Sequence, residues 1–293
     1  MTYHQFVKEV ELRIRKGVAD NICVRIHVAL KNNGCKRHGI MLTEEGINIS
    51  PTIYLEEYYQ QFQSGDTLEK ITEKILNCYE EVRFRRSWES SFFASYENVK
   101  SMIVYKVISK ERNEELLEYL PYREKVDLAL VCYVLVELNA NQTATVLIRK
   151  EHLKLWNVTE EEVFEEAEKN VRRLLPAKLD RMKDVLACML ELPVEEDDDE
   201  DIMYVMSNEI RSFGAACIFY EGVMEMIHAV LKENYYIVPS SVHEVIILPE
   251  SMAPGKREME EVVAEMNETQ VEAEEILSDK VYYYNGESRQ LSM

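Results

Sequence analysis

The stretch "NYYIVPSSVHEVIILPE", residues 234–250, decides the fold class because it contains two short apolar strands with turn residues between them. Residues 235–238 and 245–248 are rich in β-branched and aromatic side chains, which favour extended backbone. Pro-Ser-Ser at 239–241 is typical of a turn. Two strands this close together in sequence pair in the antiparallel direction, so a hairpin is predicted. Beyond its entrance the second strand is apolar on both faces, as in a central strand covered on both sides.

The segments around this hairpin extend the pattern. Residues 202–208 ("IMYVMSN") and 214–220 ("GAACIFY") have strand composition, and "KVYYYN" at 280–285 predicts a closing edge strand. A helix is expected over 221–233. A longer helix is expected over 256–279, because apolar residues recur there at roughly helical spacing: Met259, Val262, Val263, Met266, Val271 and Ile276.

The first 83 residues predict a separate set of elements. A helix over 3–18 is followed by a strand over 21–33 and by a hairpin-like pair that turns at Glu45-Gly46. Ser50 is expected to cap the next helix, with Pro51 at its first position. Gly65 ends that helix, and Asp66-Thr67 caps an amphipathic helix that starts at residue 68.

The middle of the chain predicts strands over 99–110, 126–138 and 142–150, with a short helix over 112–120. Thr159 and Glu162 have the spacing of a capping box, which predicts a helix that Pro176 ends. The alternation of strands and helices is irregular and the hairpins favour antiparallel pairing. We therefore expect an α+β fold of mixed, mostly antiparallel sheets with packed helices. Two subdomains are expected, 1–98 and 99–293, with an acidic loop "EEDDDED" at 195–201.

Charge and composition exclude several classes of function. The chain has 34 Lys and Arg against 54 Asp and Glu, a net charge of −20, so direct binding to nucleic acid or to an anionic membrane is not expected. The start has no signal-peptide core, and no run of 18 apolar residues occurs. Six widely spaced cysteines without a CxxC pair are typical of buried thiols in a reducing compartment. These features predict a cytoplasmic protein.

Four stretches together resemble a bacterial family of unknown function that is found mainly in anaerobic gut bacteria. They are "RHGIMLTEEGINISPTIYLEEYYQQFQSG", "NEIRSFGAACIFYEG", "YYIVPSSVHEVIILPE" and "VAEMNETQVEAEEILSDKVYYYN". The resemblance covers nearly the whole chain. It implies a shared fold and no particular activity.

Ser240, His243 and Glu244 are the candidate catalytic residues. A serine nucleophile requires a histidine base within hydrogen-bond reach and a carboxylate that orients the histidine. On an extended strand, however, His243 and Glu244 point to opposite faces, and the chain has no GxSxG elbow. Turn capping by Ser240 and a strand entrance at His243 explain the same residues without catalysis.

Other candidate sites are weaker. Arg37 and His38, within "CKRHG", form a local positive patch that could contact an anion or a carboxylate, or could be a solvated strand entrance. The histidines are scattered singly and Ile247 stands where a zinc-protease helix needs its second histidine, so no metal site is predicted. The chain has neither GxGxxG nor GxxxxGK[ST], so no nucleotide cofactor is predicted.

Two function hypotheses from different classes remain. The first is a non-enzymatic cytoplasmic protein that binds another protein, and an acidic mimic of DNA is a special case of it. The second is a hydrolase whose site is assembled around His243, Glu244 and Ser240. The absence of a recognisable catalytic or cofactor motif favours the first. The oligomeric state is left open by the sequence.

Overall fold

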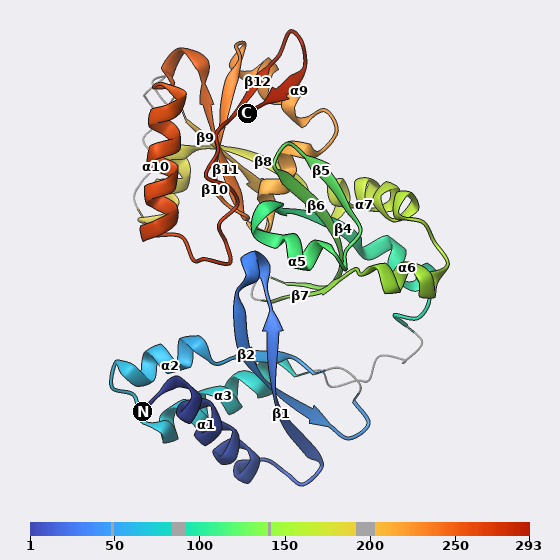
Figure 1. Cartoon of the computed structure of the whole chain (residues 1–293), viewed down its shortest axis with the longest axis vertical. Coiled ribbons are helices and arrows are strands. Elements are labelled where there is room, and N and C mark those ends of the chain that lie inside the picture. The colour runs from blue at the N-terminus through green and yellow to red at the C-terminus, as the bar shows by residue number, and fades with distance from the viewer. Residues whose placement is uncertain (48–49, 84–91, 140–141, 192–202) are drawn as a thin grey trace. The chain divides into compact units, whose positions relative to one another are not determined.

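The computed structural model describes residues 1–47, 50–83, 92–139, 142–191 and 203–293. The chain divides into two compact units, Met1–Ser95 and Tyr96–Met293, which are described here one at a time (Figure 1). The acidic run at 195–201 lies outside the described residues.

In the first unit, three helices accompany a three-stranded antiparallel sheet. The helices are α1 (Tyr3–Gly17), α2 (Glu56–Gln63) and α3 (Leu68–Val82), and the strands are β1 (Ile22–Leu30), β2 (Lys36–Glu44) and β3 (Thr52–Tyr54), paired in the order β1-β2-β3. A 3₁₀ turn, η1 (Asn32–Gly34), joins β1 to β2. One face each of α1 and α3 is buried in a shared core: Phe6, Val10 and Ile14 with Ile71, Ile75 and Tyr79. Thr67 caps α3 by accepting from the Lys70 backbone N–H, as predicted.

The helix predicted after Ser50 starts later than expected. Residues Thr52–Tyr54 form β3 against β2, and α2 begins only at Glu56 with Leu55 as its N-cap. Ser50 donates its hydroxyl to the Leu42 carbonyl instead of capping a helix. Its bond to the end of β2 and the strand-favouring side chains of β3 outweigh the Ser-Pro helix signal.

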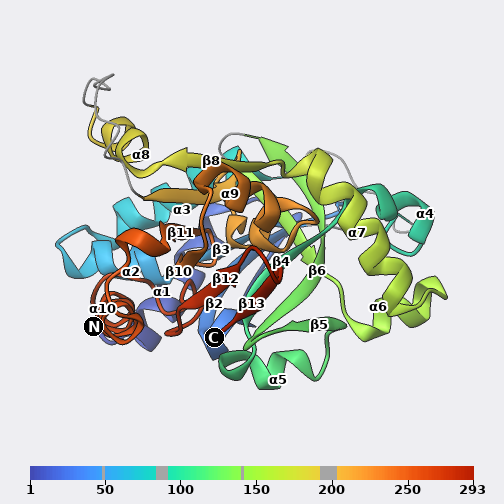
Figure 2. The same cartoon turned by 90° about the horizontal axis from the view of Figure 1, so that it is seen from above.

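The second unit begins with an antiparallel sheet of four strands. They are β4 (Ile103–Ser109), β5 (Tyr122–Lys125), β6 (Leu128–Asn139) and β7 (Gln142–Leu147), in the order β4-β6-β5 with β7 also paired to β6. Around it lie α4 (Tyr96–Val99), η2 (Lys100–Met102), η3 (Glu111–Asn113), α5 (Glu114–Leu117), α6 (Lys150–Trp156) and α7 (Glu160–Leu174). The predicted Thr159–Glu162 capping box opens α7. Asn170 of α7 donates to the Ile103 carbonyl, so α7 packs along β4 (Figure 2).

A six-stranded antiparallel sheet forms the rest of the second unit. Its order is β13-β12-β10-β11-β9-β8, from β8 (Ala177–Arg181), β9 (Tyr204–Asn208), β10 (Tyr235–Ser241), β11 (Glu244–Pro249), β12 (Tyr282–Asn285) and β13 (Gln290–Ser292). The helical elements are α8 (Met182–Met189), η4 (Gly214–Phe219), α9 (Val223–Leu231), η5 (Glu250–Met252) and α10 (Lys256–Thr269). α10 packs on one face of the sheet through Met259 and Val263 (Figure 1).

The hairpin predicted over residues 234–250 is present, but its turn lies at other residues than predicted. β10 pairs with β11 in the register Ile237↔Ile247, and β11 lies between β10 and β9, so it is a central strand as predicted. The pairing shifts between Pro239 and Ser241, and the two residues between Ser241 and Glu244 make the turn. Pro239 therefore belongs to the strand, and Ser240 lies in a bulge rather than in the turn.

Residues 214–220 form no strand, contrary to the prediction. They form the 3₁₀ helix η4 and its C-cap Tyr220. Phe213, just before η4, contacts Tyr133 of β6, which points to the same face of the sheet as its partner Val104 of β4. Tyr220 contacts Tyr105, the next residue of β4. Neighbouring strand residues point to opposite faces, so the segment touches both faces of the sheet and passes the outer edge of β4. An edge strand is thereby covered.

Two other predicted elements differ near the C-terminus. The helix expected over 256–279 ends at Thr269, because Asn267 donates to the Ser278 carbonyl and to Asp279 and so holds the returning chain. β12 is not an edge strand, since β13 pairs with its outer side. Together the sheets and helices confirm an α+β fold with antiparallel sheets. Within the described residues, no helix is both long and apolar enough to cross a membrane.

Candidate functional site

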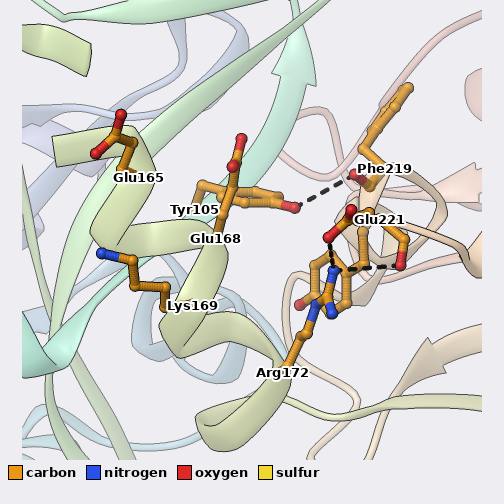
Figure 3. Close-up of a pocket in the computed structure, with 8 residues that line it drawn as sticks. Tyr105, Glu165, Glu168, Lys169, Arg172, Phe219 and Glu221 are labelled. Atoms are coloured by element: carbon orange, nitrogen blue, oxygen red, sulfur yellow. Dashed lines mark hydrogen bonds and ion pairs between the residues drawn. The ribbon is translucent and has the colours of Figure 1, made fainter. Parts of the chain in front are cut away.

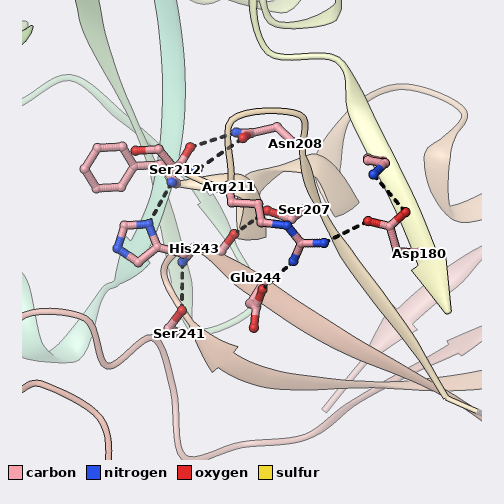
Figure 4. Close-up of polar contacts among 10 residues, drawn as sticks. Asp180, Ser207, Asn208, Arg211, Ser212, Ser241, His243 and Glu244 are labelled. Atoms are coloured by element: carbon pink, nitrogen blue, oxygen red, sulfur yellow. Dashed lines mark hydrogen bonds and ion pairs between the residues drawn. The ribbon is translucent and has the colours of Figure 1, made fainter. Parts of the chain in front are cut away.

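Both ring nitrogens of His243 face partners within the fold. Nδ1 accepts a hydrogen bond from the backbone N–H of Phe213 at 3.1 Å (Figure 4). This acceptor role places the proton of the neutral ring on Nε2, which lies 3.4 Å from Oε1 of Glu275. The ring also stacks on Phe213, with centroids 5.4 Å apart. In the neutral tautomer, His243 therefore has no free nitrogen lone pair to act as a base.

Phe213 is held in an unusual backbone conformation. Its φ of 53° lies in the left-handed region, which costs energy for a residue with a Cβ. Besides His243, its ring contacts Tyr133 edge-on and lies 4.2 Å from the Nζ of Lys106. The stack, the cation and the bond to His243 together offset this strain.

Glu244 and Ser240 do not assemble a triad with His243. Arg211 lies 3.5 Å from the Glu244 carboxylate and 2.9 Å from Asp180, so Glu244 belongs to an ion-pair network that reaches β8 (Figure 4). Among the described residues, no hydrogen bond from the Ser240 side chain is recorded. Ser241 instead accepts from the His243 backbone N–H.

The backbone around His243 is packed too tightly for added atoms. A Cβ on Gly214 would stand 2.2 Å from Ser207 Oγ and 2.7 Å from the His243 carbonyl oxygen. Ser207, which is buried, donates its hydroxyl to that same carbonyl. Asn208 closes the preceding loop by bonding both the N–H and the carbonyl of Ser212. The turn that carries His243 is thus a rigid structural corner.

Arg37 and His38, in the first unit, contact carboxylates of the same unit. Glu56 Oε1 accepts from the Tyr3 hydroxyl at 2.6 Å and from the His38 backbone N–H at 2.7 Å, and it lies 3.6 Å from His38 Nδ1. Arg37 lies 3.7 Å from Glu57. Burial opposes ionisation of Glu56, but the bonds from Tyr3 and His38 hold its pKa below the usual range. Glu56 and Glu57 of the same unit therefore already face this patch, and a ligand contact there stays a prediction.

A surface recess lies beside α7 in the second unit. It has a volume of about 560 Å³ and is lined by Tyr105, Glu165, Glu168, Lys169, Arg172, Phe219, Tyr220 and Glu221 (Figure 3). Tyr105 and Tyr220 are buried, and burial is the main cause that raises the pKa of both phenols. Their hydroxyls therefore stay protonated and bond the Phe219 and Leu175 carbonyls.

Most of the charges around the recess have partners. Arg172 pairs with Glu221, Glu168 with Arg123 at 2.7 Å, and Lys169 with Glu166 at 2.7 Å. For Glu165, no hydrogen bond or ion pair is recorded within the parts of the chain that the structure describes. The Glu165 carboxylate nonetheless attracts the Lys169 ammonium, one turn along the same helix.

The family model described as "Family of unknown function (DUF5688)" matches residues 3–286. The chain belongs to the DUF5688 family. This confirms the resemblance to a family of unknown function that the sequence motifs indicated. No curated protein and no solved structure gives a significant match.

Several residues of these clusters in the DUF5688 chain carry no sequence signal. Glu275 reaches His243 across 32 positions, and Tyr3 reaches Glu56 across 53. Only the capping box at the start of α7 could have drawn attention to the helix that lines the recess. No group of three or more metal-ligating side chains occurs within the described ranges.

Proposed function

We propose that this DUF5688 protein is a non-enzymatic binding protein that recognises another protein. The main support is that both ring nitrogens of His243 already face partners in the fold, Phe213 and Glu275, and that the ring stacks on Phe213. A catalytic histidine needs a nitrogen that can accept a proton from a nucleophile. The recess beside α7 then provides a concave, partly aromatic surface for a partner.

Electrostatics support the second unit as the binding unit. Residues 1–95 contain as many basic as acidic side chains, so the whole net charge of −20 belongs to residues 96–293. A potential of one sign attracts partners of the opposite sign and raises their association rate. The proposed partner is therefore a protein with a basic surface.

A serine-directed probe distinguishes this proposal from the hydrolase. We expect a fluorophosphonate reagent to leave Ser240 unlabelled in the native protein, because no base activates its hydroxyl. Labelling of Ser240 that disappears in His243→Gln, with the melting temperature retained, would support the hydrolase and overturn the proposal.

The binding itself is tested with the full chain. Tagged protein is used to capture partners in its native host, and each candidate is then purified and recombined with the chain. A stoichiometric complex that reforms from the two purified proteins supports the proposal. Failure of every captured protein to bind again after purification counts against it.

We also propose a cytoplasmic location, which the six free cysteines support, because exposed thiols such as Cys23 and Cys188 persist in a reducing compartment. Imitation of DNA by the acidic run at 195–201 stays a prediction, since that run lies outside the described residues.

A further inference from the structure

We propose that the outer edge of β1 binds an extended segment of a partner protein in which acidic and apolar residues alternate. The segment would pair with β1 as an added strand of the first unit's sheet. This surface lies in the first unit and is separate from the binding surface proposed in the second. Three observations support it: unpaired backbone groups along β1, basic side chains on one of its faces, and apolar side chains on the other.

The register of the sheet shows which backbone groups of β1 are unpaired. β1 is an edge strand, since the order is β1-β2-β3. His38 of β2 directs its N–H to Glu56 and its carbonyl to the Leu55 N–H, away from β1. Its register partner Val28 therefore directs its own N–H and carbonyl away from β2, and Ile26 does the same two residues earlier. Within the described residues, no hydrogen bond to the backbone of either residue is recorded along this edge.

The open part of the edge starts at Ile26. The carbonyl of Val24, which points the same way, accepts a hydrogen bond from Arg15 at 2.9 Å. Farther along, Val28 is 49% exposed and His27 is also exposed. An unpaired strand edge is a template for another strand, and proteins use such edges to bind extended peptides through main-chain hydrogen bonds.

The charge along β1 and β2 defines the chemistry of the partner. Residues 21–43 contain no acidic side chain and six basic ones: Arg25, His27, Lys31, Lys36, Arg37 and His38. Arg25 and His27 lie on the same face of β1 and are exposed, and no ion pair of either is recorded in the part of the chain that the structure describes. Carboxylates of a partner strand would complement this face.

The two faces of β1 explain why the partner's residues should alternate. Directly opposed residues of paired strands lie on the same face of a sheet. Partner residues opposite Arg25 and His27 would lie on the basic face. Those opposite Ile26 and Val28 would lie on the apolar face, where Ile26 packs against the core of the unit. Acidic and apolar side chains in turn therefore match this edge.

A second copy of the chain fits this edge less well. If two β1 strands paired here, Arg25 and His27 of one chain would lie beside the same basic side chains of the other. Like charges on opposed strands destabilise the pairing. Nucleic acid offers phosphates but no peptide groups to complete the ladder. The geometry therefore favours an acidic peptide segment over both.

The test titrates the peptide acetyl-EVEVE-amide into the full-length protein and follows it by two-dimensional amide NMR. Salt at about 0.15 M screens the net charge of the chain beyond about 8 Å. We expect saturable binding with a dissociation constant of about 0.1 to 3 mM. The amide protons of Ile26 and Val28 should shift downfield, because both gain a hydrogen bond. The peptide acetyl-KVKVK-amide should not cause these two shifts.

Methylated peptides supply a matched control for the ladder. The valines of EVEVE would stand opposite Ile26 and Val28 and exchange hydrogen bonds with them, so N-methylation of both valines should abolish binding. The N–H groups of the glutamates would point away from β1. N-methylation of two glutamates should therefore change the affinity by less than about twofold.

Variants of the protein test the two faces and the edge. Arg25→Gln should weaken binding of EVEVE by about two- to fivefold, as expected for one exposed charge pair. Arg257→Gln, at a 92% exposed position of α10, removes the same charge and should change binding by less than about twofold. Val28→Pro removes an outward N–H, which edge strands tolerate, and should weaken binding by at least about fivefold. If Val28→Pro lowers the melting temperature strongly, the methylated peptides test the same hydrogen bonds.

Four results would overturn the inference. They are equal binding of the two methylated peptides, equal weakening by the two arginine variants, shifts that map away from β1, and a dimer of the chain that Val28→Pro separates. The last would show that a second copy occupies the edge. The proposed function is judged separately: a complex that reforms with a purified basic partner while EVEVE fails to bind leaves that function standing.

Discussion

At the scale of single residues, His243 could be predicted from the sequence as a notable position, but its contact partners could not. Its serine and glutamate neighbours make it a catalytic candidate in the sequence, yet its partners in the fold are Phe213 and Glu275. His243 lies in the turn before β11, where its ring meets Phe213 and Glu275, whereas Glu244 begins the strand and meets Arg211. Gly214 is also required at its position, because it lets its backbone approach the His243 carbonyl closely.

Gly214→Ala should destabilise the protein strongly. The added Cβ would overlap Ser207 Oγ, the Asn208 backbone nitrogen and the His243 carbonyl, two of which are backbone atoms that cannot rotate away. We expect a loss of about 3 kcal/mol or more in the free energy of unfolding, at the upper end for overpacking. Gly17→Ala is the control, because its Cβ would meet only Leu76 at 3.7 Å at the end of a helix. Urea melts of both variants measure the difference, and similar losses would contradict the argument.

The two isoleucines of β11 should differ in their contribution to stability. Ile247 is fully buried, whereas Ile246 on the opposite face is only half-buried. Ile247→Ala should therefore cost about 3 to 5 kcal/mol and Ile246→Ala about half as much. Chemical denaturation of the two variants decides this. Equal costs would show that α10 covers its face of the sheet as completely as the opposite face is covered.

At the scale of elements, the sequence predicted structure best where the signal is local. The capping box of α7, the face of α3 and the β10–β11 hairpin each depend on residues within a few positions of one another. Prediction failed where distant contacts decide. The composition of residues 214–220 predicts a strand, but they form η4 along the edge of β4, which lies about a hundred residues earlier in the chain. The recess has the same origin, since α7 and residues 219–221 meet only in the fold.

The start of α6 should make stability depend on pH. His152 Nδ1 accepts from the Arg149 backbone N–H at 3.1 Å, and the ring stacks on Trp156. Burial, and then the charge of Arg149, lower the pKa of His152. As the pH falls, His152 is therefore protonated in the unfolded chain before it is protonated in the folded one. Its contribution to stability is complete above the unfolded pKa of about 6.5 and is lost as the pH falls through the lower folded value.

His152→Gln isolates this effect, because glutamine keeps an acceptor that does not titrate. Thermal melts between about pH 7.5 and pH 5 should show a smaller loss of stability for the variant than for the parent protein. If the melting temperatures of the two proteins changed in parallel with pH, protonation of His152 would not destabilise the fold.

At the scale of the whole molecule, charge is divided unevenly between the two units. The first unit is balanced and the second has the full excess of acidic residues. Repulsion among like charges destabilises a compact state, and salt screens it. The two units should therefore respond differently to ionic strength.

This difference is measurable if residues 1–95 and 96–293 are produced separately. We expect each to unfold cooperatively, because each encloses its own buried residues. Raising NaCl from about 0.02 M to about 0.5 M should raise the melting temperature of 96–293 by several degrees and leave that of 1–95 nearly unchanged. Equal shifts would show that the acidic residues are already neutralised by pairing.

The coverage of β4 by residues 213–220 has a consequence for biosynthesis. The four-stranded sheet is complete once residue 147 has been made, but the segment that shields its outer edge is synthesised some seventy residues later. At about 5 to 20 residues per second, the nascent sheet waits roughly 4 to 15 s with an open edge. During that interval it can pair with a neighbouring nascent chain on the same messenger, so chaperones that hold unpaired strands would have their greatest effect on yield in this window.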